Sequence, residues 1–354
     1  MLRMDTGAPI GGLQRATSKR IGFGRFVLLF ALAAVAGVAA MIVLPHDKYL
    51  RYQALNDHSA PTAYWIYERI HNDPAPIDVA FIGTSRTGLS VNTARLEQQL
   101  AERGVHVKAA NLHIVKTGRN MQYVVAKELL THRKVKTLVL EMTELEDRKP
   151  HPDFIFLADP IDVIDAPLLI NLNYFSDLGR LPGRQIDLFF DTQLQARGLR
   201  TPDFVPPPYE GSNLDHSEYI RTLDGVKHDR NDVHTAAEMD AIRAQQDADI
   251  TPPVLPASMS GLEFRFPRYY VDKILQLAQE KGAAVVFLYT PRFGGPAEPP
   301  PYAQYAGRGD LINPSARLED YRLWDDASHV NWNGAQLMTA AVADALAKRP
   351  ELRN

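Results

Sequence analysis

The chain has 354 residues with a formal net charge of -3; hydrophobic residues make up 45% of it and charged residues 23%, and it contains no cysteine. This length suffices for one large α/β domain with insertions or for two smaller domains. The lack of cysteine excludes disulfides, thiolate zinc sites, iron–sulfur clusters and a cysteine nucleophile, and the charge balance without an arginine-rich or zinc-type motif argues against nucleic-acid binding.

An uncharged apolar run extends from Phe26 to Leu44. At a rise of 1.5 Å per residue it is just long enough to cross the ~30 Å hydrocarbon core as a helix. The basic residues before it predict that residues 1–25 stay in the cytoplasm. We therefore expect a single-pass anchor in the inner (cytoplasmic) membrane, with the rest of the chain periplasmic or otherwise extracytoplasmic. A cleavable signal peptide is the alternative, although typical signal cores are shorter. The uniformly apolar circumference disfavours a buried core helix.

Strand and helix patterns alternate after the anchor, beyond a linker at residues 45–76 that is expected to contain one helix. The predicted strands are residues 77–82, 105–112, 136–142 and 284–289. The predicted helices are residues 63–70, a helix capped by Asn92 and ended by Gly104, and residues 121–130, 269–281 and 333–348.

This alternation predicts an α/β fold, with a parallel sheet flanked by helices and connected by right-handed crossovers. Residues 77–145 and 261–354 are expected to form the α/β domain. Residues 146–260 interrupt the alternation and are rich in proline, aspartate and aromatic residues. We expect them to form an inserted, partly helical lobe over the sheet. So long a weakly patterned insertion is more often functional than idle.

The sequence Gly83-Thr84-Ser85-Arg86 follows the first predicted strand. Ligands of open parallel sheets bind outside the carboxyl ends of the strands, and Gly83 permits a tight turn there. Ser85 is therefore a candidate nucleophile whose backbone N–H could contribute to an oxyanion hole. The alternative is a turn that only caps a helix. A phosphate-binding loop is disfavoured, because the glycine spacing and the lysine of such loops are missing.

Asp326 and His329 lie near the other end of the chain, just before the last predicted helix. A serine hydroxyl is a poor nucleophile until an imidazole removes its proton, and the imidazole works best when a carboxylate fixes its tautomer. The spacing of three residues lets one turn place both side chains together. A polar surface loop is the alternative for an isolated pair of this kind.

Gly83-Thr84-Ser85 after a buried strand, together with Asp326-x-x-His329, resembles the SGNH (GDSL-like) hydrolase superfamily, with its flavodoxin-like α/β fold. The N-terminal anchor and the closing sequence LWDDASHVNWNGAQLM resemble the anchored proteins of cell-envelope acylation, such as those for alginate O-acetylation and teichoic-acid D-alanylation. The resemblance covers about residues 77–145 and 265–348. It implies that Ser85 is the nucleophile, His329 the base and Asp326 the carboxylate that orients it.

The superfamily also supplies a glycine N–H and an asparagine to the oxyanion hole. By position Gly118 corresponds to the glycine, offset from the usual pattern, while Glu141 or Thr143 stands where the usual Gly-x-Asn is absent. One missing donor typically costs ~10²–10³ in turnover. Gly118 and Thr143 are the candidate oxyanion-hole or substrate-binding residues. Arg86 is a candidate for binding an anionic acceptor, or else a solvent-facing residue.

The resemblance implies an acyl esterase or O-acyltransferase that acts on a cell-surface or secreted glycan through an acyl-serine intermediate, with a membrane-bound O-acyltransferase as a possible partner. A non-catalytic glycan-binding or assembly subunit is the first alternative, because the third sequence block departs from the family pattern. A lipid-directed esterase or thioesterase is the second. We expect no metal and no redox cofactor, because neither HExxH nor a glycine fingerprint is present.

Overall fold

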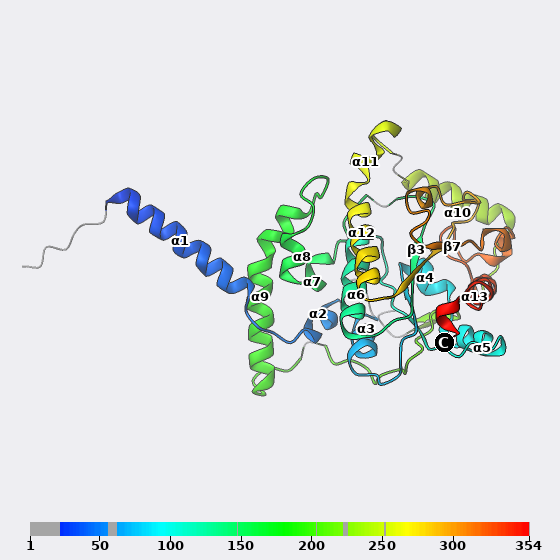
Figure 1. Cartoon of the computed structure of the whole chain (residues 1–354), viewed down its shortest axis with the longest axis horizontal. Helices are drawn as coiled ribbons and strands as arrows, with labels where there is room; N and C mark the ends of the chain where they lie inside the picture. Colours follow the sequence, from blue (N-terminus) through cyan, green and yellow to red (C-terminus); the bar gives the residue numbers. More distant parts are fainter. Residues whose placement is uncertain are drawn as a thin grey trace, which may run out of the picture.

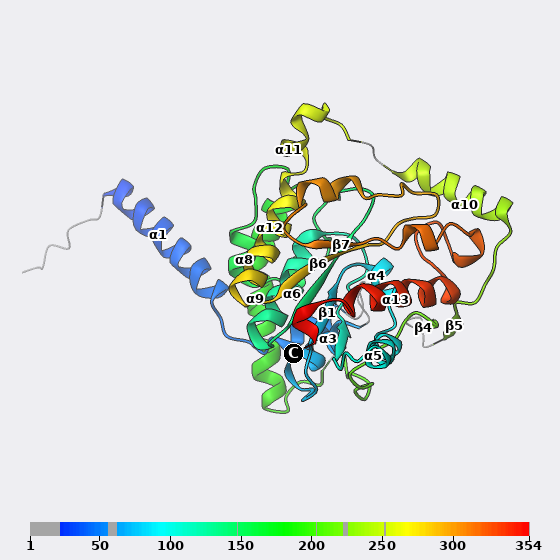
Figure 2. The same ribbon diagram turned by 45° about the vertical axis from the view of Figure 1, so that its right-hand side comes forward.

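The computed structural model describes residues 22–55, 62–146, 148–202, 204–221, 226–250 and 253–353. A parallel sheet forms the centre of the molecule, helices cover both of its faces, and one N-terminal helix projects away from the body (Figures 1 and 2). This arrangement confirms the predicted α/β fold with a parallel sheet flanked by helices.

The sheet has five strands in the order β2-β1-β3-β6-β7, and every neighbouring pair is parallel. The strands are β1 (Val79–Ile82), β2 (Ala109–Asn111), β3 (Thr137–Met142), β6 (Ala284–Tyr289) and β7 (Asp310–Ile312). Four of them lie within the predicted ranges, with β2 much shorter than the predicted 105–112. The sequence analysis missed β7, which has only three residues and follows a loop rich in glycine and proline.

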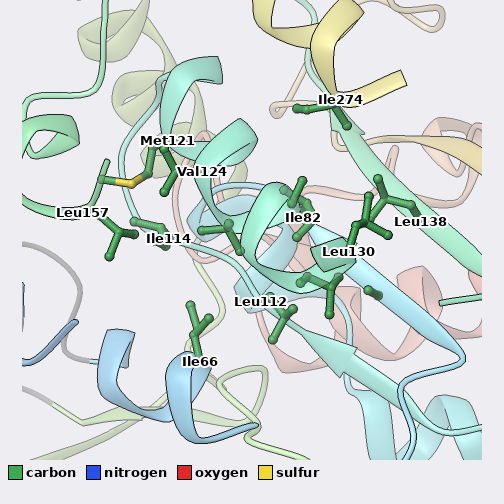
Figure 3. Packing of buried hydrophobic residues seen from close by; sticks show 14 of the residues in the cluster. Ile66, Ile82, Leu112, Ile114, Met121, Val124, Leu130, Leu138, Leu157 and Ile274 are labelled. Atoms are coloured by element: carbon green, nitrogen blue, oxygen red, sulfur yellow. The ribbon is translucent and has the colours of Figure 1, made fainter. Parts of the chain in front are cut away.

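Alternate residues of the central strands enter two different cores, because successive side chains of a strand point to opposite faces. Ala80 and Ile82 belong to a core that packs under α6 (Arg119–His132) and α12 (Arg265–Glu280). Figure 3 shows part of this core, with Ile82 and Leu138 of the sheet among side chains of these helices. Val79 and Phe81 enter the second core, which packs under the helices of the opposite face.

Three helices of that opposite face and of the chain's first third follow the predictions closely: α3 (Ala63–His71), α5 (Thr93–Glu102) and α13 (Trp332–Leu346). Asn92 caps α5 through a hydrogen bond from the Arg95 N–H at 2.8 Å, and the chain leaves this helix through Gly104 at a φ of 77°. Two short helices were not predicted, α2 (Tyr49–Ala54) and α4 (Ser85–Ser90), so the linker contains two helices and not the one expected.

Between β3 and α12, the described residues form several helices and one pair of antiparallel strands. The elements are α7 (Phe154–Leu157), α8 (Pro160–Ile164), α9 (Tyr174–Ala196), β4 (Tyr219–Arg221), β5 (Lys227–Asp229), α10 (Ala236–Asp249) and α11 (Ser260–Glu263). Both views place α8 and α9 beside the N-terminal helix and α10 at the opposite end of the body (Figures 1 and 2). The boundaries of the inserted lobe and of the other domains stay predictions.

The N-terminal helix α1 covers Phe23–Ile42, shifted by a few residues from the predicted apolar run 26–44. All of it lies within the described residues, and none of its side chains is buried. It is the one helix among the described residues that is long and apolar enough to cross a membrane.

Candidate functional site

Three side chains from the two ends of the chain form a continuous hydrogen-bond chain at the carboxyl edge of the sheet. The Oγ atom of Ser85, at the start of α4, lies 2.9 Å from Nε2 of His329. Nδ1 of His329 lies 2.9 Å from Oδ2 and 3.1 Å from Oδ1 of Asp326. The fold therefore brings together the three residues that the sequence singled out, although Ser85 and His329 are 244 residues apart.

The loop before α13 holds Asp326 and His329 in a single turn. Oδ1 of Asp326 accepts hydrogen bonds from the backbone N–H groups of Ser328 at 2.6 Å and His329 at 2.8 Å. The carbonyl of His329 accepts in return from the N–H of Asp325 at 2.9 Å. These bonds fix the imidazole relative to the carboxylate before any substrate binds.

Hydrogen bonding also decides the protonation state of Asp326. Burial alone would raise the pKa of this carboxyl, but the His329 imidazole and the two N–H donors outweigh burial and lower it to about 2. An ionised Asp326 accepts a hydrogen bond from the protonated Nδ1 of His329. The unprotonated Nε2 is then free to accept the proton of the Ser85 hydroxyl. This is the arrangement that a general base requires.

A buried glutamate determines the conformation of the serine turn. Oε2 of Glu141, at the end of β3, accepts from the backbone N–H and hydroxyl of Thr84, both at 3.0 Å. It also accepts from the N–H of Thr87 at 3.1 Å and from its hydroxyl at 2.6 Å. Gly83 is required here, because a Cβ would lie 2.8 Å from the same carboxylate oxygen. Glu141 thus fixes the residues on both sides of Ser85, a role that the sequence analysis did not predict.

Arg86 points its guanidinium at a carboxylate and is not solvent-facing. Its Nη1 and Nη2 donate to Glu144 at 2.7 and 3.1 Å, and Nη1 also donates to the carbonyl of Thr290 at 3.2 Å. Burial lowers the pKa of Arg86, but Glu144 more than compensates and raises it overall. The solvent-facing alternative is therefore wrong, and binding of an anionic acceptor by Arg86 stays a prediction.

Gly118 and Thr143, the two candidate oxyanion-hole residues, lie in different surroundings. Gly118 is the N-cap of α6 with a φ of 145°, and a Cβ there would lie 2.6 Å from the backbone nitrogen of His151. Conformation and close packing thus both require glycine at this position. Thr143 follows β3, lines the cleft and donates its hydroxyl to the carbonyl of Leu145 at 2.8 Å. Oxyanion binding by either residue stays a prediction.

A cleft of about 560 Å³ adjoins the triad. Thr84, Arg86 and Ser328 line it, and each of them is the chain neighbour of Ser85 or His329. The rest of the wall combines polar and charged side chains with apolar ones, among them Thr143, Glu144, Glu146, Arg148, Lys149, Gln246 and Arg292 on the polar side and Leu145, Ile250, Pro253 and Phe264 on the apolar side. The cleft therefore offers an acceptor both hydrogen-bonding and apolar groups beside the serine turn.

Residues of the segment between β3 and β6 support the triad from outside. The buried guanidinium of Arg230 donates to the carbonyls of Leu89 at 2.8 Å and Ser217 at 3.0 Å, and to that of Val330. It thereby connects the serine helix α4 with the residue that follows His329. Oε1 of Gln246 on α10 accepts from the Ser328 hydroxyl at 2.8 Å. Only burial and partners reveal these roles, since neither residue belongs to a recognisable motif.

Two further residues near the triad, Trp324 and His113, are structural. Trp324 is 1% exposed and its indole N–H donates to the carbonyl of Leu318 at 2.9 Å, so it packs the loop. His113 is buried beneath α4 against Gly88 and His216, and its Nδ1 has no hydrogen-bond partner among the described residues. Burial lowers the pKa of His113 to about 3, which keeps the ring neutral.

One group of side chains among the described residues has the geometry to hold a metal ion: His71, Glu128 and His132, whose candidate ligand atoms lie within 4.8 Å of one another. Glu128 and His132 are near the carboxyl end of α6, which returns to the opposite sheet edge from Ser85. Glu128 already pairs with the ammonium group of Lys48 and with His71, at 2.8 Å for the latter. We assign this group no part in the chemistry at Ser85.

Comparison with known proteins finds neither a family model nor a curated protein that matches this chain.

Proposed function

We propose that this chain is a membrane-anchored, extracytoplasmic serine esterase or O-acyltransferase of the SGNH type that acts on a cell-surface or secreted glycan. The observation that carries the proposal is the continuous hydrogen-bond chain from Ser85 through His329 to Asp326. Its distances are those of a nucleophile, a base and an orienting carboxylate. The resemblance of the sequence motifs to the SGNH superfamily supports the same reaction class.

The proposed reaction proceeds in two halves. His329 Nε2 takes the proton of Ser85 as Oγ forms a bond to the acyl carbonyl carbon. The bond from this carbon to the donor's oxygen then breaks, and His329 returns the proton to the leaving alkoxide. Water or a sugar hydroxyl attacks the acyl-serine, with His329 again as base, and Ser85 is released with its proton. Hydrolysis and transfer use the same residues and differ only in the acceptor.

The cleft beside the serine turn supports a glycan as acceptor. Charged and hydroxyl side chains such as Glu144, Arg148 and Thr143 line it and could bind the hydroxyl groups of a sugar, and its apolar residues could pack against a sugar ring. The α1 helix, as an anchor with its N-terminus in the cytoplasm, would keep the domain near a membrane-bound O-acyltransferase that delivers acyl groups across the bilayer.

A non-catalytic assembly or glycan-binding subunit is the second candidate. It is favoured by Glu141, which stands in place of the family's Gly-x-Asn and whose Oε2 accepts four hydrogen bonds from the serine turn. A carboxylate cannot donate a hydrogen bond to an oxyanion while ionised. This candidate predicts an intact fold without turnover.

Turnover of an acetyl ester by the full chain in detergent micelles separates the two candidates. We expect Ser85→Ala and His329→Ala to reduce turnover by two or more orders of magnitude. Ser90→Ala on the same helix and His106→Ala on the surface are matched controls that should retain it. Equal turnover in all five proteins would contradict the proposed site, and no turnover by the folded wild type would favour the non-catalytic subunit.

A further inference from the structure

An exposed apolar surface lies on α8, the loop after it and the first turn of α9. Six large apolar side chains between residues 161 and 175 are at least 42% exposed, and Leu172 reaches 90%. This 161–175 surface consists of Ile161, Ile164, Leu168, Leu169, Leu172 and Phe175. Scattered apolar residues are normal on soluble proteins, but a cluster of this kind marks a surface that something apolar covers.

The carboxyl end of α1 is bonded to α9, the helix in which this surface ends. The carbonyl of Ile42, the last residue of α1, accepts from Nε2 of Gln185 at 3.0 Å. Five residues further along the chain, the N–H of Asp47 donates to the hydroxyl of Thr192 at 2.9 Å. A membrane spanned by α1 therefore begins immediately beside α9.

The two views agree on which side of the body this is. α8 and α9 lie on the side from which α1 projects, and α6 and α12 lie between them and α4 (Figures 1 and 2). The apolar surface and the anchor thus belong to one side, and the serine helix belongs to the other.

We propose that the 161–175 surface rests in the interfacial layer of the bilayer that α1 spans, with lipid as its occupant. Apolar side chains of interfacial segments typically enter the headgroup and acyl boundary by about 5–10 Å. Lipid is favoured over a second protein because the surface lies on the side of the body from which α1 projects. As a membrane-spanning anchor without a buried side chain of its own, α1 would bring the bilayer to this side in every copy of the chain. This contact adds a second membrane attachment to the single helix.

The second attachment would orient the domain as well as hold it. An anchor alone lets the domain rotate about the linker, whereas an interfacial face restricts which side meets the lipid. Because α4 lies on the side away from α1, the cleft beside Ser85 would open toward the extracytoplasmic space, where a polymer can reach it. The inference rests on the anchoring part of the proposed function and not on the serine chemistry.

The absence of native cysteine allows a direct test with one introduced thiol. Full-length Leu172→Cys carries an environment-sensitive fluorophore and is reconstituted in phosphatidylglycerol–phosphatidylcholine vesicles. Quenching is compared between lipid with a nitroxide near the headgroup and iodide present on both sides of the membrane. Val233→Cys, at a position that is 55% exposed just before α10, is the matched control. Phe175→Cys gives a second reading of the same surface.

We expect the nitroxide lipid to reduce the Leu172 and Phe175 signals at least two-fold, and iodide to quench them several-fold less than the Val233 signal. Quenching by iodide equal to that of Val233, without quenching by the lipid, would overturn the proposal. Shielding from both quenchers would also overturn it, because the occupant would then be a second copy of the chain. Retention of the chain in alkali-washed vesicles reports the anchor separately, and acetyl-ester turnover reports the serine site.

Discussion

Replacement of Glu141 by glutamine tests whether this carboxylate holds the serine turn. The side chain is 2% exposed, and its Oε2 accepts four hydrogen bonds from Thr84 and Thr87. Hydrogen bonds to a charged group contribute roughly 1.5–3 kcal/mol each and neutral ones about 0.5–1.5. Glutamine keeps an acceptor oxygen but loses the charge. Because four bonds that share one oxygen are not additive, we expect Glu141→Gln to lower the free energy of unfolding by about 2–4 kcal/mol.

The same substitution should reduce turnover through geometry. Thr84 and Thr87 flank Ser85, so a looser turn moves Oγ relative to Nε2 of His329, and a displacement of about 1 Å can cost on the order of 10²-fold in rate. We expect kcat for an acetyl ester to fall about 10- to 100-fold with little change in KM. Urea unfolding and steady-state turnover measure the two effects on the same preparation.

Glu128→Gln is the matched control for this experiment. Glu128 is also a buried glutamate with ion-pair partners, but it lies on α6 at the sheet edge opposite Ser85. We expect it to lose stability and to keep its turnover per folded molecule. Wild-type unfolding and wild-type turnover in Glu141→Gln would refute the reasoning, as would an equal loss of turnover in both variants.

Three further predictions follow from the same region. Arg230→Met should lower the free energy of unfolding in urea by about 2–4 kcal/mol, because the carbonyls of Leu89, Ser217 and Val330 lose a charged donor. Its kcat should fall at least tenfold while KM is maintained, and an unchanged kcat would show that the link between α4 and Val330 is not needed. Asp326→Asn should reduce acetyl-ester turnover on the order of 10²–10⁴-fold. Because the wild-type pKa of Asp326 is about 2, titration of this carboxyl should cause no change of the wild-type rate near neutral pH. His113→Gln should reduce the pH dependence of the free energy of unfolding. The pKa of His113 is about 3 in the folded chain and 6.5 in the unfolded chain. Between these two pH values the unfolded chain binds more protons, so the stability of wild type falls as the pH is lowered. The loss on going from neutral pH to about pH 5 should be roughly 2 kcal/mol larger in wild type than in the variant, and equal losses would contradict this account.

Much of the sheet could be predicted because its central strands are buried on both faces and appear in the sequence as continuous apolar runs. The run Ala284–Tyr289 coincides with β6, and residues 136–142 contain all of β3. β2 is shorter than its pattern because, among the described residues, it pairs with β1 alone and through just three of its residues. The apolar Val105 and Val107 are buried without belonging to a strand. β7 forms only by pairing with β6, and no local pattern marks it.

The candidate site shows the same division between local and long-range information. The positions of Ser85 and of the Asp326–His329 pair could be predicted, because a strand end and a turn are local features. The roles of Glu141, Arg230 and Gln246 could not, because each depends on which distant backbone or hydroxyl groups the folded chain places around a buried polar atom. Arg86 was predicted as a possible solvent-facing residue for the same reason, since its partner Glu144 follows a different strand.

The most direct test of the central claim is mass spectrometry of the folded full chain after treatment with a fluorophosphonate, which forms a stable adduct with an activated serine. We expect one adduct that maps to Ser85 and that disappears in His329→Ala over the same exposure. A folded chain with no adduct at Ser85, or an adduct that forms equally fast without the imidazole, would contradict the claim that His329 activates this hydroxyl.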